Sequence, residues 1–355
     1  MEPKPYNTLL AIARELKLWL TPSRQTYVQL PAAHNPASAV PLWSEEFFTW
    51  CFAKFNFENF PAPITYNRVL RQLDEDARAQ PRDTVQPSNL RATAVKGGYH
   101  IDLGGPIIHL TGKQWTLLPP APDENRGIRS GQDPAFLRPA TNHTLPHPTE
   151  STKELRDYFR DAFGIDEEPA SKLGQWLELA LRPDQPCPTL VLTGELRDEA
   201  ARAIRNLIDP SNCAMFPFPP SRGEAGWMAV YNRVLAFPLY GKISEFKRTV
   251  LKSLANGTFA VRLRQSDKKL PPITEFLSRP VILTADTAPE ISRSQISIEI
   301  KRCSPLPQQE VLAALFTQMA CSLHDEKQSP QRIDFQAPRS ISIQPIATLA
   351  DAPVP

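Results

Sequence analysis

Residues Thr189–Ser211 read TLVLTGELRDEAARAIRNLIDPS, and this segment says most about the architecture of the chain. Its apolar opening, Leu190–Leu192, predicts a buried strand, and Gly194 follows that strand. Strand, glycine turn and helix in this order form a phosphate-binding P-loop in some proteins and an ordinary strand–turn–helix unit in others. The helix is predicted by apolar residues at spacings of three and four, namely Ala200, Ala203, Ile204, Leu207 and Ile208.

The residues that carry P-loop chemistry are missing from this segment. A working loop reads G-x-x-x-x-G-K-[ST], in which the lysine reaches the β and γ phosphates and the hydroxyl holds magnesium. Counted from Gly194, those three positions hold Glu199, Ala200 and Ala201. A carboxylate therefore stands where phosphate would approach. We expect a degenerate site that binds no nucleotide cofactor and no metal, and that has no catalytic residue.

Later segments predict the rest of an α/β unit, with a mostly parallel sheet over roughly residues 170–305. In ATPases of this architecture, the strand after the P-loop ends in an acidic residue that supports magnesium. The strand expected here ends in Tyr231 and Asn232, so that acid is missing too. The expected strands are Gly226–Asn232, Thr258–Lys269, Arg279–Ala285 and Ile291–Ile300, with a helix at Ile243–Leu254.

The order and spacing of these segments resemble a known family. It is the P-loop ATP-binding proteins, often described as primase- or helicase-like, found beside replication genes of bacterial prophages and integrative elements. Their pattern includes L-I-D-P-S after the loop helix, a strand ending D-N, T-G-G-G-F-A-x-R, and R-P-V-I-L-N. The matching residues here are Gly194, Arg205, Leu207–Ser211, Asn232, Asn256–Arg262, Arg279–Leu283 and Arg293.

The departures from this family fall on its catalytic positions. The lysine is Ala200, the magnesium hydroxyl is Ala201, the strand acid is Tyr231, and the sensor asparagine is lost near Thr284. The resemblance therefore implies a degenerate P-loop NTPase-like fold, in which the scaffold segments persist and ATP hydrolysis is lost.

Arg293 matches an arginine that, in the resembled family, points toward the γ-phosphate. Without a phosphate, a guanidinium in a closed site needs a carboxylate, because burying it unpaired is costly. We therefore expect an ion pair between Arg293 or Arg197 and one of the loop acids. Those acids are Glu195, Asp198 and Glu199.

Four regions are expected along the chain. They are an α+β domain (6–120), a proline-rich linker (121–150), the degenerate P-loop NTPase-like domain (151–325) and a flexible tail (326–355). The short segments Tyr99–Gly104 and Phe136–Pro139 resemble the motifs Y-L-D-L-G and F-R-R-P of the same family. Helices are expected at Thr8–Leu20, Glu45–Phe57, Thr65–Ala79, Ser151–Phe163 and Ser171–Leu181, and strands at Tyr27–Leu30, Leu90–Val95, Tyr99–Leu103 and Trp115–Leu118.

The composition predicts a cytoplasmic protein. The 355 residues carry a formal net charge of +2, so no global field attracts nucleic acid. No run of eighteen apolar residues and no secretory signal is visible. The 5 cysteines are odd in number and far apart, which argues against disulfides and zinc. A metal site of His100, Asp102 and His109 is a minor alternative.

Basic residues after the second strand offer a possible contact with nucleic acid. Lys247, Arg248 and Lys252 share one face of the expected helix, and Arg262 and Arg264 follow. They could contact phosphates, although a solvated charged face explains them as well.

The functional expectation is a non-catalytic, pseudo-ATPase-like accessory or interaction protein of phage or mobile-element DNA replication. Its expected partners are replication proteins of the same element, or DNA. Two alternatives stay open. One is an active ATP-binding helicase- or primase-associated ATPase in which Arg197 or Arg202 replaces the lysine. The other is a nucleic-acid-binding module without nucleotide.

Overall fold

The computed structural model describes residues 5–20, 26–30, 38–55, 60–79, 90–104, 106–118, 136–137, 143–183, 185–211, 213, 215–263, 273–292 and 295–328. Arg264, Arg293, the tail after residue 328 and most of the expected linker lie outside these ranges. Within the described part, no helix combines the length and apolar composition needed to cross a membrane.

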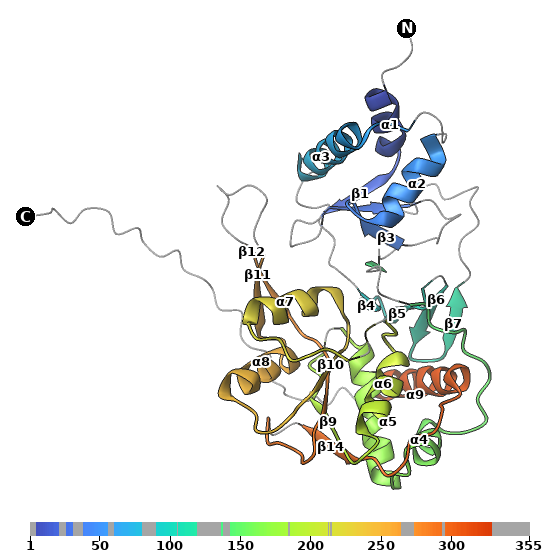
Figure 1. Cartoon of the computed structure of the whole chain (residues 1–355). Coiled ribbons are helices and arrows are strands. Elements are labelled where there is room, and N and C mark those ends of the chain that lie inside the picture. The colour runs from blue at the N-terminus through green and yellow to red at the C-terminus, as the bar shows by residue number, and fades with distance from the viewer. Residues whose placement is uncertain are drawn as a thin grey trace, which may run out of the picture.

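A four-stranded parallel sheet forms the centre of the C-terminal half, as expected (Figure 1). Strand β9 (Leu190–Thr193) lies inside it, paired with β13 (Val281–Thr284) on one side and β14 (Ile296–Glu299) on the other. Strand β10 (Leu235–Pro238) pairs with the far side of β13. The segment that precedes Gly194 is therefore an interior parallel strand.

Both faces of this sheet are covered, and the alternation of side chains along β9 shows it. Leu190 and Leu192 belong to one hydrophobic core, whereas Val191 between them belongs to another. Figure 1 shows helices on either side of the strands. The helices that contribute to the first core are α4 (Leu155–Phe163), α5 (Glu167–Leu181), α6 (Arg197–Asn206) and α9 (Gln308–Gln328). Those that contribute to the second core are α7 (Arg222–Tyr231) and α8 (Glu245–Ala255).

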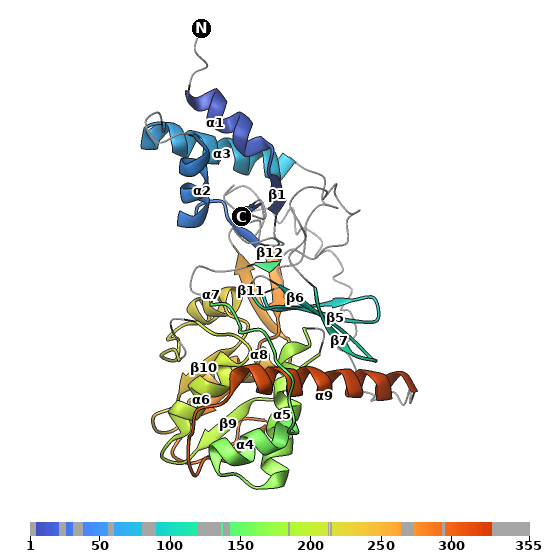
Figure 2. The ribbon, with the colours of Figure 1, turned by 90° about the vertical axis from the view of Figure 1, so that its right-hand side faces the viewer.

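Two antiparallel elements attach to this unit. One is a hairpin of β11 (Phe259–Leu263) and β12 (Ile273–Leu277). The other is a four-stranded meander whose buried side chains join the first core, and Figure 2 shows α9 running beneath it. Trp115 Nε1 donates to Thr317 Oγ1 of α9 at 3.2 Å. The meander strands are β4 (Ala92–Val95), β5 (Gly98–Asp102), β6 (Ile107–Thr111) and β7 (Trp115–Leu118).

The N-terminal part has a separate hydrophobic core. Helix α2 begins as expected after Ser44, whose Oγ accepts the Phe47 N–H at 3.2 Å and caps the helix. This part also contains a four-stranded sheet, in which the short strand β8 (Phe136–Leu137) is the edge strand and pairs with β3 (Ser38–Pro41). The remaining elements are α1 (Pro5–Arg14), β1 (Lys17–Leu20), β2 (Thr26–Gln29), β3 (Ser38–Pro41), α2 (Glu45–Phe55) and α3 (Pro63–Ala79).

The expected strand at Gly226–Asn232 is wrong, because these residues form the end of helix α7 and its cap. Ser221 Oγ accepts the Glu224 N–H at 3.2 Å, so Ser221-Arg-Gly-Glu224 starts a helix as an S-x-x-E capping box does. Ala225 and Ala229, four residues apart, are both buried in the second core. The second parallel strand is β10, nearer the C-terminus than expected.

Smaller corrections concern element ends. The helix expected over Thr8–Leu20 stops at Arg14, and Lys17–Leu20 form strand β1, paired with β2. Helix α3 starts at Pro63 rather than Thr65, as proline suits a first helical position. The last parallel strand spans Ile296–Glu299 and not the whole of Ile291–Ile300. Strands β6 and β12 and helix α9 have no counterpart among the expected elements.

Candidate functional site at the carboxyl edge of the parallel sheet

The glycine turn after β9 serves the sheet itself. Gly194 has a φ of 100°, a conformation that favours glycine, and an added Cβ would collide with the carbonyl oxygen of Ile300. Only Glu195 and Leu196 separate it from the first residue of α6. The turn is therefore short, and its glycine allows the chain after β14 to pass close by.

The three positions that hold the second glycine, the lysine and the hydroxyl in a working P-loop lie within helix α6 of this chain. The Ala200 N–H already donates to the Leu196 carbonyl at 3.0 Å, as in a regular helix. Ala200 and Ala201 are both 0% exposed and belong to the first core, whereas Glu199 is exposed. A lysine or hydroxyl at positions 200 and 201 would point into the protein interior.

Arg197 ties the turn to the neighbouring strand. Its Nη1 donates to the Gly194 carbonyl at 2.9 Å, and its Nη2 pairs with Asp286 Oδ1 at 2.6 Å, just after β13. Arg197 therefore pairs with Asp286, and the expected pair of Arg197 with a loop acid is wrong. Asp198 Oδ1 is buried and accepts no hydrogen bond from the described residues. Arg293, the other candidate, lies outside them.

Tyr231 and Asn232 stand at the end of α7 and not at the end of a parallel strand. The Tyr231 ring lies against Trp227, with ring centroids 4.4 Å apart. Asn232 Nδ2 donates to the Met228 carbonyl at 2.9 Å, which caps the helix. The strand that does end here, β10, closes with Pro238 and is followed by Leu239. Neither Pro238 nor Leu239 offers a side-chain oxygen to magnesium.

Asp209 of the LIDPS segment and Asn232 belong, with Arg205, to a buried polar network. Asp209 is 0% exposed, and its Oδ2 accepts the backbone N–H groups of Arg233 at 2.9 Å and Val234 at 3.0 Å. Arg205, also 0% exposed, donates from Nη2 to Asn232 Oδ1 at 3.0 Å. This network holds the end of α6 against the start of β10.

Arg91 extends the same network to the meander. Its Nε pairs with Asp209 Oδ1 at 3.3 Å, and its Nη2 donates to the His143 carbonyl at 2.5 Å. Burial lowers the pKa of Arg205, and the nearby Asp209 carboxylate opposes that shift. The Asp209 carboxylate pairs with Arg91, and both arginines also donate to carbonyl or amide oxygens, as buried polar groups require.

Arg279, the arginine of the RPVIL segment, also binds backbone carbonyl groups inside the protein. Arg279 is buried, its Nε donates to the Ala229 carbonyl of α7 at 2.6 Å, and its Nη1 donates to the Ser278 carbonyl at 2.8 Å. In this chain, polar side chains of the LIDPS and RPVIL segments therefore connect the ends of helices to the starts of strands.

The basic residues of α8 differ in their surroundings. Lys247 Nζ lies over the Phe218 ring, 5.3 Å from its centroid, and Lys252 is exposed. Arg248 lines a pocket at the ends of β10 and β13. Arg262 lies in β11, but its side chain, like the whole of Arg264, is outside the described part.

The two meander histidines pair with each other. His100 Nε2 and His109 Nδ1 lie 2.8 Å apart across β5 and β6, while Asp102 Oδ1 accepts the Gly104 N–H at 2.9 Å. In the described ranges, no three His, Cys, Asp or Glu side chains gather as a metal site.

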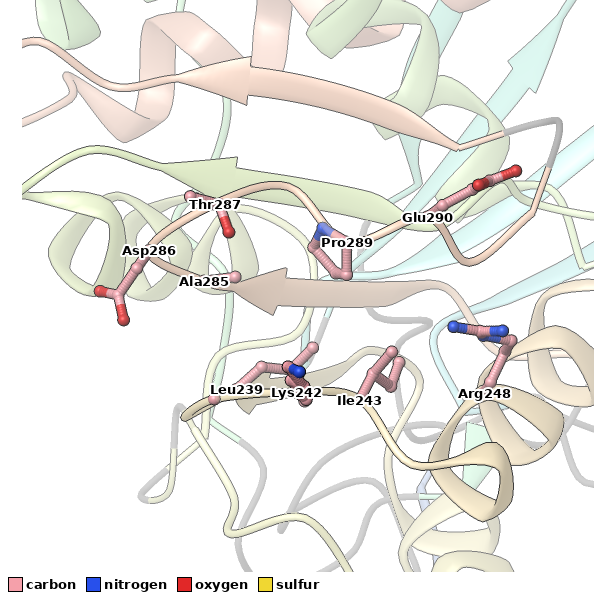
Figure 3. A pocket seen from close by; sticks show the side chains of 10 residues that line it. Leu239, Lys242, Ile243, Arg248, Ala285, Asp286, Thr287, Pro289 and Glu290 are labelled. Atoms are coloured by element: carbon pink, nitrogen blue, oxygen red, sulfur yellow. The ribbon is translucent and has the colours of Figure 1, made fainter.

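A pocket of about 510 Å³ opens where β10 and β13 end (Figure 3). The carboxyl ends of parallel strands are where open α/β sheets bind ligands. One wall is formed by the loop after β10 and by α8, and the other wall is formed by the segment after β13. The lining residues are Leu239, Gly241, Lys242, Ile243, Arg248, Ala285, Asp286, Thr287, Pro289 and Glu290. The sequence patterns did not indicate it, because its two walls are distant in sequence.

No protein-family model matches the chain, and no curated protein matches its sequence. Among solved structures, the chain is similar to the apo A form of the NrS-1 C-terminal region, with 10% identity, 90% of this chain, 68% of that chain and a TM-score of 0.42. A second apo structure of that region gives 10% identity, coverage of 91% and 70%, and a TM-score of 0.40. Similarity at this level assigns neither a family nor a function to this chain.

Proposed function

We propose that this chain is a non-catalytic, ATPase-like accessory or interaction protein of phage or mobile-element DNA replication. The link to replication rests on the resemblance of the segments around Asp209, Phe259 and Arg279 to the prophage ATP-binding proteins. The loss of catalysis rests on the chemistry at the carboxyl edge of the parallel sheet.

The observation that carries the proposal is the burial of Ala200 and Ala201. In a P-loop, the lysine and hydroxyl at these positions contact phosphate and magnesium. Here both alanine side chains pack in the first core, and the following parallel strand ends in Pro238. Each lost charge-assisted hydrogen bond is of the kind worth about 1.5–3 kcal/mol. A carboxylate at Glu199 adds repulsion.

The active-enzyme alternative needs a substitute cation, and Arg197 is the nearest one. Its guanidinium already binds the Gly194 carbonyl and Asp286. To reach a phosphate, Arg197 would have to give up a 2.6 Å ion pair. Arg202 is exposed on α6, one turn beyond the helix start. This arrangement favours a structural role for Arg197.

Calorimetric titration with Mg-ATP tests the proposal. We expect no binding in the micromolar range, and the same heats after magnesium is removed with EDTA. An Arg197→Ala variant serves as the matched control. A magnesium-dependent micromolar isotherm in the unaltered chain that disappears in Arg197→Ala would replace our proposal with the active ATPase.

Replication proteins of the same element, or DNA, remain the proposed partners. Fluorescence anisotropy with labelled single- and double-stranded oligonucleotides at about 50 and 200 mM salt separates them. For a protein-binding accessory we expect weak affinity for both oligonucleotides. Tight binding that falls steeply with salt and weakens in Lys252→Ala would favour the nucleic-acid-binding module.

A further inference from the structure

The pocket at the ends of β10 and β13 has a composition suited to an anionic small molecule. Leu239, Ile243, Ala285 and Pro289 give it an apolar lining, and Lys242 and Arg248 supply positive charge on one wall. Figure 3 shows these two cations on the side of the loop after β10 and of α8, facing the segment of Thr287, Pro289 and Glu290. A volume of about 510 Å³ is within the usual range for small-ligand sites.

Arg248 is the residue that points to a missing acceptor. Its Nε is buried and has no hydrogen-bond partner among the described residues. Among the described residues, its ion pair from Nη1 to Glu245 Oε2 is 3.7 Å long and joins neighbouring turns of α8. A guanidinium presents five donors in a fork that matches carboxylate and phosphate oxygens. Buried donors without acceptors are rare in folded proteins, and because the Arg248 side chain as a whole is 37% exposed, a ligand in the pocket can reach it.

The charge balance of the pocket also favours an anion. Asp286 lines it, but its carboxylate already pairs with Arg197 at 2.6 Å. Within the lining, the cations Lys242 and Arg248 then face one further acid, Glu290. Glu245 lies outside the lining, is 81% exposed and approaches Arg248 only to 3.7 Å. Thr287 adds a hydroxyl that can donate to an oxyanion. Glu290 can accept from a hydroxyl or amino group elsewhere on the same ligand.

We propose that this pocket binds a small oxyanion ligand, held by Arg248 and Lys242 through a phosphate or carboxylate group. The site lies beside the Gly194 turn, to which Asp286 and Arg197 connect it, and it needs no magnesium, because its own cations neutralise the ligand. It can therefore exist whether or not the chain has lost ATP binding.

Calorimetry on the full chain with inorganic pyrophosphate, inorganic phosphate and succinate, each without magnesium, tests the inference. We expect saturable binding of at least one probe, with a Kd near 1 mM or tighter. Binding of the phosphate probes but not succinate assigns a phosphate ligand, and the reverse assigns a carboxylate. We expect Arg248→Ala and Lys242→Ala to weaken binding at least tenfold, Lys252→Ala, outside the pocket on α8, to change it less than twofold, and Glu290→Gln to strengthen binding of the anion.

Three results would overturn the inference: no saturable binding of any probe, binding unchanged in Arg248→Ala, or equal weakening in Lys252→Ala. Circular dichroism of each variant checks that the fold is retained, and the expected gain in Glu290→Gln cannot arise from unfolding. A magnesium-dependent ATP isotherm that survives Arg248→Ala would contradict the proposed function and leave this inference standing.

Discussion

At the scale of single residues, Asp209 shows how one buried carboxylate can join helix and strand ends that are distant in sequence. The carboxylate accepts two backbone N–H groups at the start of β10 and pairs with Arg91. Arg205 Nη2 lies 4.0 Å from it on the other side. All of these groups are buried. Removing one charge of such a cluster leaves the others uncompensated in the interior.

We expect Asp209→Asn to lower the free energy of unfolding by about 3–5 kcal/mol, because two arginines lose their buried counter-charge. Asp166→Asn is the matched control, since Asp166 is 83% exposed and pairs with Lys301 at 3.6 Å. An exposed pair of that kind is worth about 0–1 kcal/mol. Urea denaturation measures both. Equal small shifts would show that the network around Asp209 adds nothing to stability.

The residues at the candidate site could be identified from the sequence, but their contacts could not. Glu199, Ala200 and Ala201 are visible by counting from Gly194. The partner of Arg197 was not, because Asp286 lies 89 residues away and reaches Arg197 only through the pairing of β9 with β13. Acids close in sequence were the natural choice, but Arg197 Nη2 pairs with Asp286.

At the scale of elements, apolar periodicity predicted three of the four parallel strands and failed at α7. The run Gly226–Asn232 has the apolar content of a strand, and a short run of this kind does not reveal its period. The deciding signal was the S-x-x-E box at Ser221–Glu224, upstream of the run. Gly226 fits the helix because an added Cβ would press on the Val261 side chain of β11.

We expect Ser221→Ala to lower the free energy of unfolding by about 1 kcal/mol, since the Glu224 N–H loses its acceptor at the start of α7. Ser253→Ala is the comparison, because Ser253 lies inside α8, where alanine is the better helix former. Thermal melting of both variants gives the difference. A strand at this segment would instead make Ser221→Ala neutral, and a shift no larger than that of Ser253→Ala would contradict the cap.

At the scale of the whole molecule, the α/β class and the parallel sheet could be predicted from the sequence. The grouping of elements around cores could not, because it depends on contacts between distant segments. Helix α9 is the clearest example. Its residues carry apolar side chains around most of the helix, and it packs under the meander and against α4 and α5. Sequence order places the meander with the N-terminal part, whereas its buried side chains share a core with α9.

The last prediction concerns this division. We expect calorimetry to resolve two unfolding transitions, one for the core that contains Leu9 and one for the core that contains Ile108 and Ile204. Each of these side chains is 0% exposed, so truncation to alanine costs about 2–5 kcal/mol. Leu9→Ala should shift the first transition, and Ile204→Ala the second.

Ile108→Ala is the decisive variant of the three. Because Ile108 of β6 packs in the same core as Ile204, it should shift the second transition. A shift of the first transition by Ile108→Ala would instead favour a domain boundary near residue 120, as sequence order predicts. A single transition moved equally by all three variants would show that the two cores unfold as one cooperative unit, because the N-terminal part then depends on its neighbour for stability.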